Sequence, residues 1–82
     1  MEKDYFWVIR GKQRKKVMKV MDKAKIPTQI KEDTKLSLNN VSDVLREFKK
    51  KKLAKCLNPK ERTGRLYKLT PKGMKIKEML EE

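Results

Sequence analysis

The stretch SLNNVSDVLREF, residues 37–48, decides the fold of this chain. Its apolar side chains recur at helical spacing within an arc of ~120°, an ordinary core-facing stripe: Leu38, Val41, Val44, Leu45 and Phe48. Ser37 precedes them and can cap the helix, because its hydroxyl can accept from an unpaired backbone N–H. Lysines occupy positions 49–52, where the helix dipole favours cations. The stretch predicts a helix over residues 38–51 with one buried face and one polar face.

The polar face of this helix carries side chains that suit nucleic acid. Asparagine can bond to the edge of adenine, arginine to guanine or phosphate, and lysine to phosphate. Asp43 counts against a DNA contact unless it accepts from cytosine or orients Arg46. The candidate contacts are Asn39, Asn40, Ser42, Asp43, Arg46, Lys49 and Lys50. The alternative is an ordinary solvated face, and the segments next to the helix favour the contact.

Two short apolar runs follow, residues 53–57 and 65–69, and they predict a β-hairpin. The loop between them reads NPKERTG, residues 58–64, and is rich in turn-forming residues. Three cations cluster around this loop: Lys60, Arg62 and Arg65. They can contact a polyanion, or they can keep the hairpin soluble and blunt its edges. Their clustering around one glycine-bearing loop favours contact.

Further helices are predicted on both sides. Apolar residues at helical spacing predict a helix over residues 12–25, and Pro27 suits the first turn of a short helix that ends near residue 33. Thr28 and Gln29, at the start of this short helix, can donate to phosphate. A capping threonine and a first-turn proline predict a last helix over residues 71–81. Residues 4–10 can form a strand or extend the first helix, although Gly11 weakens the second option. A strand between the first two helices is a further alternative.

The chain carries 24 Lys and Arg residues against 11 Asp and Glu, a formal net charge of +13. Such a field favours a polyanionic partner, because a bound polyanion releases counterions. A lysine-rich solvated surface, common in proteins from hot environments, is the alternative. Its 82 residues, 37% of them hydrophobic, suit one small domain over residues 1–82. No apolar run approaches the ~20 residues of a spanning helix, so we expect a soluble, cytoplasmic protein with no membrane partner.

Side chains for catalysis and metal binding are scarce. The chain has no histidine and one cysteine, Cys56, so neither an internal disulfide nor an ordinary zinc site can form. The usual general base is missing, and the three glycines form no phosphate-binding loop. We therefore expect no enzyme activity, no metal and no cofactor. Cys56 lies in a predicted strand and is interpreted as a small buried apolar residue.

The order of the elements resembles the winged helix-turn-helix domain of MarR- and ArsR-like transcriptional regulators, particularly small archaeal ones. The resemblance covers about residues 10–80. It is carried by GKQR at 11–14, PTQI at 27–30, LSLNNVS at 36–42 and GRLYKLTPKG at 64–73. Two features depart from the family. Lys35 stands where the family often has glycine, so a left-handed turn there would be strained, and the metal-binding Cys and His pattern of ArsR-like sensors is absent.

The resemblance implies a mainly α fold with a small β-hairpin wing, in which the helix at 38–51 enters the major groove and the wing at 58–65 touches backbone or minor groove. It implies a transcriptional regulator that binds double-stranded DNA sequence-specifically. Small regulators of this type usually form homodimers, and we expect the dimer surface to combine segment 5–9 with the first or last helix. The alternative is a protein-interaction module of transcription or replication machinery, in which Tyr5, Phe6 and Trp7 would matter most.

Overall fold

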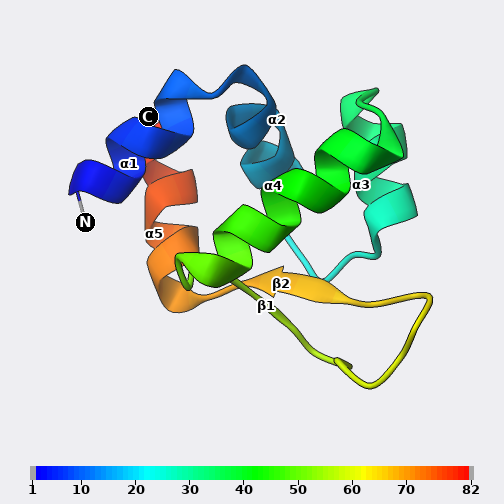
Figure 1. Ribbon diagram of the computed structural model, residues 1–82. Helices are drawn as coiled ribbons and strands as arrows, with labels where there is room; N and C mark the ends of the chain where they lie inside the picture. Colours follow the sequence, from blue (N-terminus) through cyan, green and yellow to red (C-terminus); the bar gives the residue numbers. More distant parts are fainter. Residues whose placement is uncertain (1, 82) are drawn as a thin grey trace.

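The computed structural model describes residues 2–81, which form five helices and one antiparallel pair of strands (Figure 1). The helices are α1 (Glu2–Arg10), α2 (Lys12–Val20), α3 (Pro27–Thr34), α4 (Leu38–Lys50) and α5 (Pro71–Leu80). The strands β1 (Ala54–Cys56) and β2 (Tyr67–Leu69) come between α4 and α5 in the sequence. A mainly helical chain with a small hairpin was predicted, and this is confirmed. The hairpin loop projects from the molecule at the end away from α1 (Figure 1).

One hydrophobic core lies between the helices and the start of the hairpin. Each of the five helices contributes buried side chains to it, among them Val8, Val17, Ile30, Phe48 and Ile76. The amphipathic pattern predicted for α4 is confirmed for four of its five apolar residues: Val41, Val44, Leu45 and Phe48. The prediction is wrong for Leu38, which is 41% exposed. The first turn of α4 extends past the core, so this side chain lies beside the hairpin loop instead.

The helix predicted over residues 12–25 ends early, because α2 stops at Val20. The backbone of Lys25 pairs instead with that of Tyr67, through hydrogen bonds of 3.0 and 2.9 Å that add an isolated bridge to the hairpin. Lys25 Nζ donates to Val20 O at 2.6 Å and to Asp33 Oδ2 at 2.8 Å. The bond to Asp33, with the nearby Asp22, raises the pKa of Lys25. Pairing with a distant segment thus overrides the local helical pattern.

Residues 4–10 belong to a separate helix, α1, and form neither a strand nor a continuation of α2. Gly11 separates the two helices with an extended backbone, φ −103° and ψ 112°. Asp4 holds α1 in place through an ion pair of 2.7 Å with Lys72 of α5. This hydrogen bond lowers the pKa of Asp4, against the opposing effect of burial, and Lys51 adds to the lowering. The amino-terminal helix is therefore docked on the rest of the fold.

The turn between α3 and α4 is tightly bonded. Thr34 ends α3, and its Oγ1 accepts from Leu36 N at 3.3 Å. Lys35 adopts φ 64°, in the left-handed region, so the backbone strain predicted there is present. Ser37 caps α4 as predicted, because its Oγ accepts from Asn40 N at 3.1 Å. The direction of α4 relative to α3 is thus set by bonds within a few residues.

The hairpin is shorter than the two apolar runs predicted, and its pairing ends with Cys56 opposite Tyr67. Leu53 lies outside β1, because its N–H donates to Phe48 O at the end of α4. Leu57 N still donates to Leu66 O at 2.8 Å, so the two segments of the hairpin stay close beyond the paired strands.

The junction between the hairpin and α5 fixes the direction in which the hairpin leaves the core. Thr70 caps α5 as predicted, since its Oγ1 accepts from Gly73 N at 3.2 Å. The same hydroxyl donates to Lys52 O at 2.7 Å. Gly73 is buried against the carbonyl of Leu53, and a Cβ at this position would overlap that oxygen. The first turn of α5 therefore packs directly on the backbone that leads into β1.

Candidate nucleic-acid interface

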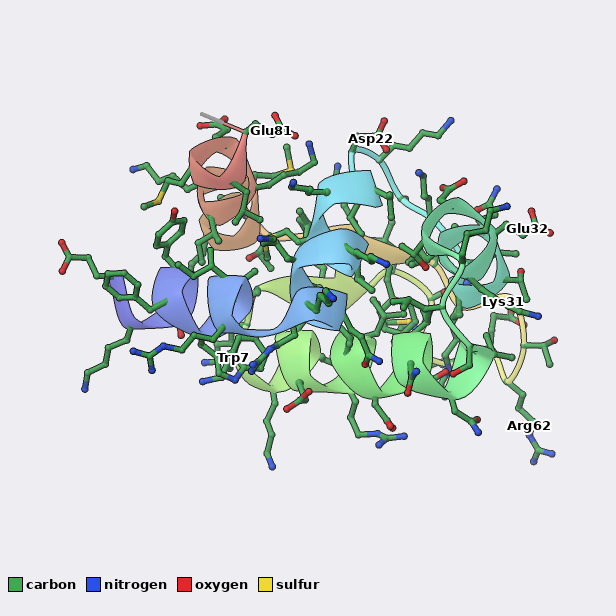
Figure 2. The ribbon with its side chains drawn as sticks, turned by 90° about the horizontal axis from the view of Figure 1, so that it is seen from above. Trp7, Asp22, Lys31, Glu32, Arg62 and Glu81 are labelled. Carbon is green, nitrogen blue, oxygen red and sulfur yellow. The ribbon has the colours of Figure 1, made fainter. Side chains whose placement is uncertain are left out.

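The exposed face of α4 and the hairpin loop are on the same side of the molecule. In Figure 1 this side faces the viewer, with α4 in front and the hairpin loop at lower right. In Figure 2 it forms the lower edge, where Arg62 extends outward. The labelled carboxylates Asp22, Glu32 and Glu81 lie in the upper part of that view. These three acidic residues are therefore set away from the surface shared by α4 and the hairpin.

A hollow of about 340 Å³ lies between the first turn of α4 and the hairpin loop, and we call it the α4–hairpin hollow. Leu38 and Pro27 supply apolar walls, and Arg62 and Arg65 border it. A smaller adjoining hollow of about 200 Å³ follows α4 and is lined by Ser42, Arg46, Lys49 and Arg65, among others. Within residues 2–81, no Asp or Glu lines either hollow. The charged residues that line the two hollows are therefore all basic.

The opposite flank of α4 carries the acidic residues of that helix, Asp43 and Glu47. They line a separate hollow with Lys12 and Gln13 from the start of α2. The charges of α4 are thus segregated across its width, with cations toward the hairpin and carboxylates toward α2. A polyanion on α4 would be drawn toward the hairpin side, because no carboxylate of the described residues lines the two hollows there.

Arg46 projects from the middle of the exposed face, with its side chain 75% exposed. Its Nη1 lies 3.1 Å from Asp43 Oδ1, a contact that matches one of the two roles predicted for Asp43. Such an exposed pair adds little stability, and its guanidinium lies along the helix toward the preceding turn. Asn39 and Lys50 are exposed on the same face, whereas Asn40 is half-buried.

The hairpin loop is organised by Asn58. Its Oδ1 accepts from Leu66 N at 2.7 Å and its Nδ2 donates to Gly64 O at 3.1 Å. Gly64 adopts φ 65°, which a residue with a Cβ would adopt only with strain. One side chain thus closes the loop across its base, so the loop has a defined shape before any ligand binds.

The three cations predicted for the loop differ in their exposure and in their hydrogen bonds. Lys60 and Arg62 are exposed, and Arg62 borders the α4–hairpin hollow. Arg65 is half-buried, and its Nε donates to Glu61 O at 2.6 Å. The structure therefore brings Arg62 and Arg65 together with Arg46 and Lys49 of α4 along two adjoining hollows, whereas Lys60 lines neither.

The two residues predicted to meet phosphate at the start of α3 have different roles. Gln29 Oε1 accepts from Ile26 N at 3.1 Å and so completes the cap of its own helix. Thr28 is exposed and lines the α4–hairpin hollow. The geometry therefore retains Thr28 as a contact candidate and assigns the side-chain oxygen of Gln29 to local structure.

The aromatic residues of α1 are mostly used within the fold. Trp7 lies edge-on to Phe48, with ring centroids 5.9 Å apart. Arg14 and Lys51 lie over its ring, 4.3 and 4.7 Å from the centroid. Tyr5 and Trp7 pack against the core, whereas Phe6 is 48% exposed. A protein-interaction surface built on all three aromatics is therefore reduced to Phe6.

Three residues of the surface shared by α4 and the hairpin were not predicted as part of it. Leu38 was assigned to the core, and Tyr67 was placed only in the second apolar run of the predicted hairpin. Asn58 had a readable signal, because asparagine in a turn often bonds to nearby backbone. For Leu38 and Tyr67 the sequence gives no such signal, because their position on this surface depends on how the hairpin folds back toward α4.

Other predicted features have simple outcomes. Cys56 is half-buried rather than buried, and its Sγ lies 3.6 Å from Asn58 Oδ1. Within residues 2–81, no cluster of three or more potential ligand side chains could hold a metal ion. In the same part of the chain, no helix has the length and apolar character needed to span a membrane.

Comparisons of this chain with protein-family models, curated proteins and solved structures give no match. The function is therefore argued from the residues and geometry above.

Proposed function

We propose that this chain is a winged helix-turn-helix domain that binds double-stranded DNA sequence-specifically and regulates transcription. The observation that carries the proposal is the pair of adjoining hollows between α4 and the hairpin loop, in which every charged lining residue is basic. An exposed helix can enter the major groove of DNA, which is wide enough to admit it. The loop beside it can then reach the adjacent backbone or minor groove.

The element order supports this assignment. In the proposal α3 and α4 are the two helices of the helix-turn-helix, joined by the turn at Lys35, and the β1–β2 hairpin is the wing. The bridge between Lys25 and Tyr67 corresponds to a minimal third strand beside β2. The proposed identity thus accounts for the early end of α2, which a plain helical bundle would leave unexplained.

The roles follow from exposure and chemistry. Asn39 and Arg46 lie on the outermost face of α4 and are assigned to base edges, where asparagine suits adenine and arginine suits guanine. The cations assigned to phosphates are Lys49, Lys50, Lys60, Arg62 and Arg65, and Thr28 can donate to a phosphate at the start of α3. Phosphate contacts set position and affinity, and base contacts set sequence preference.

The test is a selection from random duplex DNA followed by mobility shifts with charge-matched variants. Arg46→Ala should weaken binding to the selected duplex about fivefold or more and relax the preference at one base pair, since a bidentate base contact contributes ~1–3 kcal/mol. Lys19→Ala removes one exposed positive charge from α2 and should change affinity little. Equal affinity for selected and random duplexes would refute sequence-specific binding.

We also propose that the chain acts as a homodimer that pairs through α1 and α5. Phe6 leaves an exposed aromatic ring on α1, and Met79 and Leu80 at the end of α5 are only half-buried. Two recognition helices in a dimer would meet successive major grooves, roughly 34 Å apart. Sedimentation equilibrium of wild type and Phe6→Ser tests this proposal. A 9.8 kDa monomer that stays monomeric on a palindromic duplex would refute it.

A further inference from the structure

Leu38 is an exposed apolar residue at the start of α4, beside the basic hairpin loop. It is 41% exposed, whereas the other four apolar residues of its stripe are at most 3% exposed. The amino terminus of a helix is often stabilised by contact between the apolar residue before the N-cap and the fourth residue of the helix. Leu38 is neither of these residues, so helix capping does not require it. In α4 these are Leu36 and Val41, and both pack in the core. The described fold therefore leaves the apolar area of Leu38 uncovered.

The surroundings of Leu38 restrict what can cover it. Leu38 lines the α4–hairpin hollow with Pro27, while Arg62 and Arg65 border the same hollow and no acidic residue of the described chain lines it. An apolar protein segment would cover the leucine but leave the charges of the two arginines desolvated without an anionic partner. A small inorganic anion would pair with the arginines but leave the leucine exposed. The matching ligand carries a small apolar group beside negative charges.

Duplex DNA has this combination. The 5-methyl group of thymine projects into the major groove, where apolar side chains contact it, and phosphates flank it on both sides. Leu38 is the first residue of α4, and the amino-terminal residues of a recognition helix are those that contact base edges.

We infer that Leu38 contacts the 5-methyl group of one thymine, while Arg62 and Arg65 contact phosphates of the flanking backbone. This inference rests on the proposed DNA-binding function and adds a specificity-determining residue to it. Leu38 then favours thymine over cytosine, which has no methyl group at that position. This contact adds one apolar base contact to a recognition helix whose other proposed base contacts are polar.

The experiment compares thymine with deoxyuridine, which lacks only the methyl group. Each thymine of the selected duplex is replaced singly, and dissociation constants are measured for the wild-type chain, Leu38→Ala and Leu57→Ala. Leu57 is a matched control, because it is 47% exposed but does not line the hollow. Loss of one buried methyl group corresponds to about fourfold weaker binding. We expect this loss at one position for wild type and Leu57→Ala, and no loss at that position for Leu38→Ala.

The outcomes separate the two proposals. If the selected duplex is bound specifically but no uracil replacement weakens binding, the Leu38 inference is overturned and DNA binding stands. The Leu38 inference is also overturned if Leu38→Ala keeps the uracil effect, or if it weakens all duplexes equally. If the chain binds no duplex, the proposed function fails, and the Leu38 contact fails with it.

Discussion

Asp43 Oδ1 lies 3.1 Å from Nη1 of Arg46, one turn along the exposed face of α4. The pair places a negative charge next to the arginine that is assigned to a base edge. In the proposed DNA complex, Asp43 therefore has two separable effects. Its charge repels phosphates, and its hydrogen bond restricts where the guanidinium can reach.

Asp43→Asn should raise the affinity for all duplexes several-fold, because it removes one negative charge from the interface. It should also change the preference at the base pair that Arg46 contacts, since the guanidinium is released. Glu47→Gln is the control, with the same charge change on the same helix but outside this ion pair. Fluorescence anisotropy on duplexes with all four base pairs at each position measures both effects. Identical results for the two variants would contradict a positioning role for Asp43.

Asn58 should control the order of the hairpin loop. Asn58→Ala removes the acceptor of Leu66 N and the donor to Gly64 O, so exchange of the Leu66 amide hydrogen should accelerate by tenfold or more if ~1.4 kcal/mol of local protection is lost. Asn58→Asp keeps the acceptor and loses the donor, so it should preserve most of the protection at Leu66. Hydrogen exchange followed by NMR measures this difference. Unchanged exchange in Asn58→Ala would contradict the role of this side chain.

Lys35→Gly should stabilise the fold by about 0.5–1 kcal/mol. The left-handed backbone at φ 64° strains a residue with a Cβ, and glycine relieves this strain, partly offset by the greater freedom of glycine in the unfolded chain. Lys31→Gly makes the same chemical change inside α3 and should instead cost about 1 kcal/mol. Urea unfolding followed by the fluorescence of Trp7 measures both variants. A loss of stability in Lys35→Gly would contradict the strain assigned to this turn.

Stability should fall in acid, partly through Asp4. Its hydrogen bond to Lys72 lowers its pKa in the folded protein below the ordinary value of 3.8, so the unfolded chain binds protons more readily. The stabilisation is therefore present above pH 3.8 and is lost as the pH falls through the lower folded-state pKa. The hydrogen bond from Lys25 lowers the pKa of Asp22 as well, so Asp22 also contributes to the loss of stability in acid.

We expect the free energy of unfolding to fall below about pH 4, and the fall should be shallower in Asp4→Asn than in wild type. Urea unfolding at a series of pH values gives both curves. If the free energy of unfolding falls equally steeply in acid in the two proteins, Asp4 contributes no pH dependence.

Local signals in the sequence predicted much of the fold. The caps at Ser37 and Thr70, the buried stripe of α4 and the strained turn at Lys35 each depend on a few neighbouring residues, and each is confirmed, apart from Leu38 in the stripe. The end of α2 was not predictable in this way, because the backbone of Lys25 pairs with a strand far along the chain. The same limit applies to α1, which is anchored by the distant Lys72.

The candidate surface was predictable in its outline but not in its detail. The basic residues of α4 and the hairpin loop are visible in the sequence, and a capping glutamine at the start of α3 is a known local pattern. That Leu38 leaves the core, and that Arg65 joins Arg46 and Lys49 around one hollow, depends on the angle between the hairpin and α4. Gly73 packs against the carbonyl of Leu53 where the hairpin meets α5, and no local pattern reports such a contact between distant residues.

The most direct test of the proposed function is the salt dependence of binding to the selected duplex and to a scrambled one. Contact with about six phosphates per protomer predicts a slope of about −5 for each protomer bound, in a plot of log affinity against log salt concentration. Arg65→Ala should reduce the magnitude of this slope by about one, whereas Lys75→Ala on α5 should leave it unchanged. The account predicts this slope together with tighter binding of the selected duplex at every salt concentration. A slope near zero, or equal affinity for the two duplexes, would contradict it.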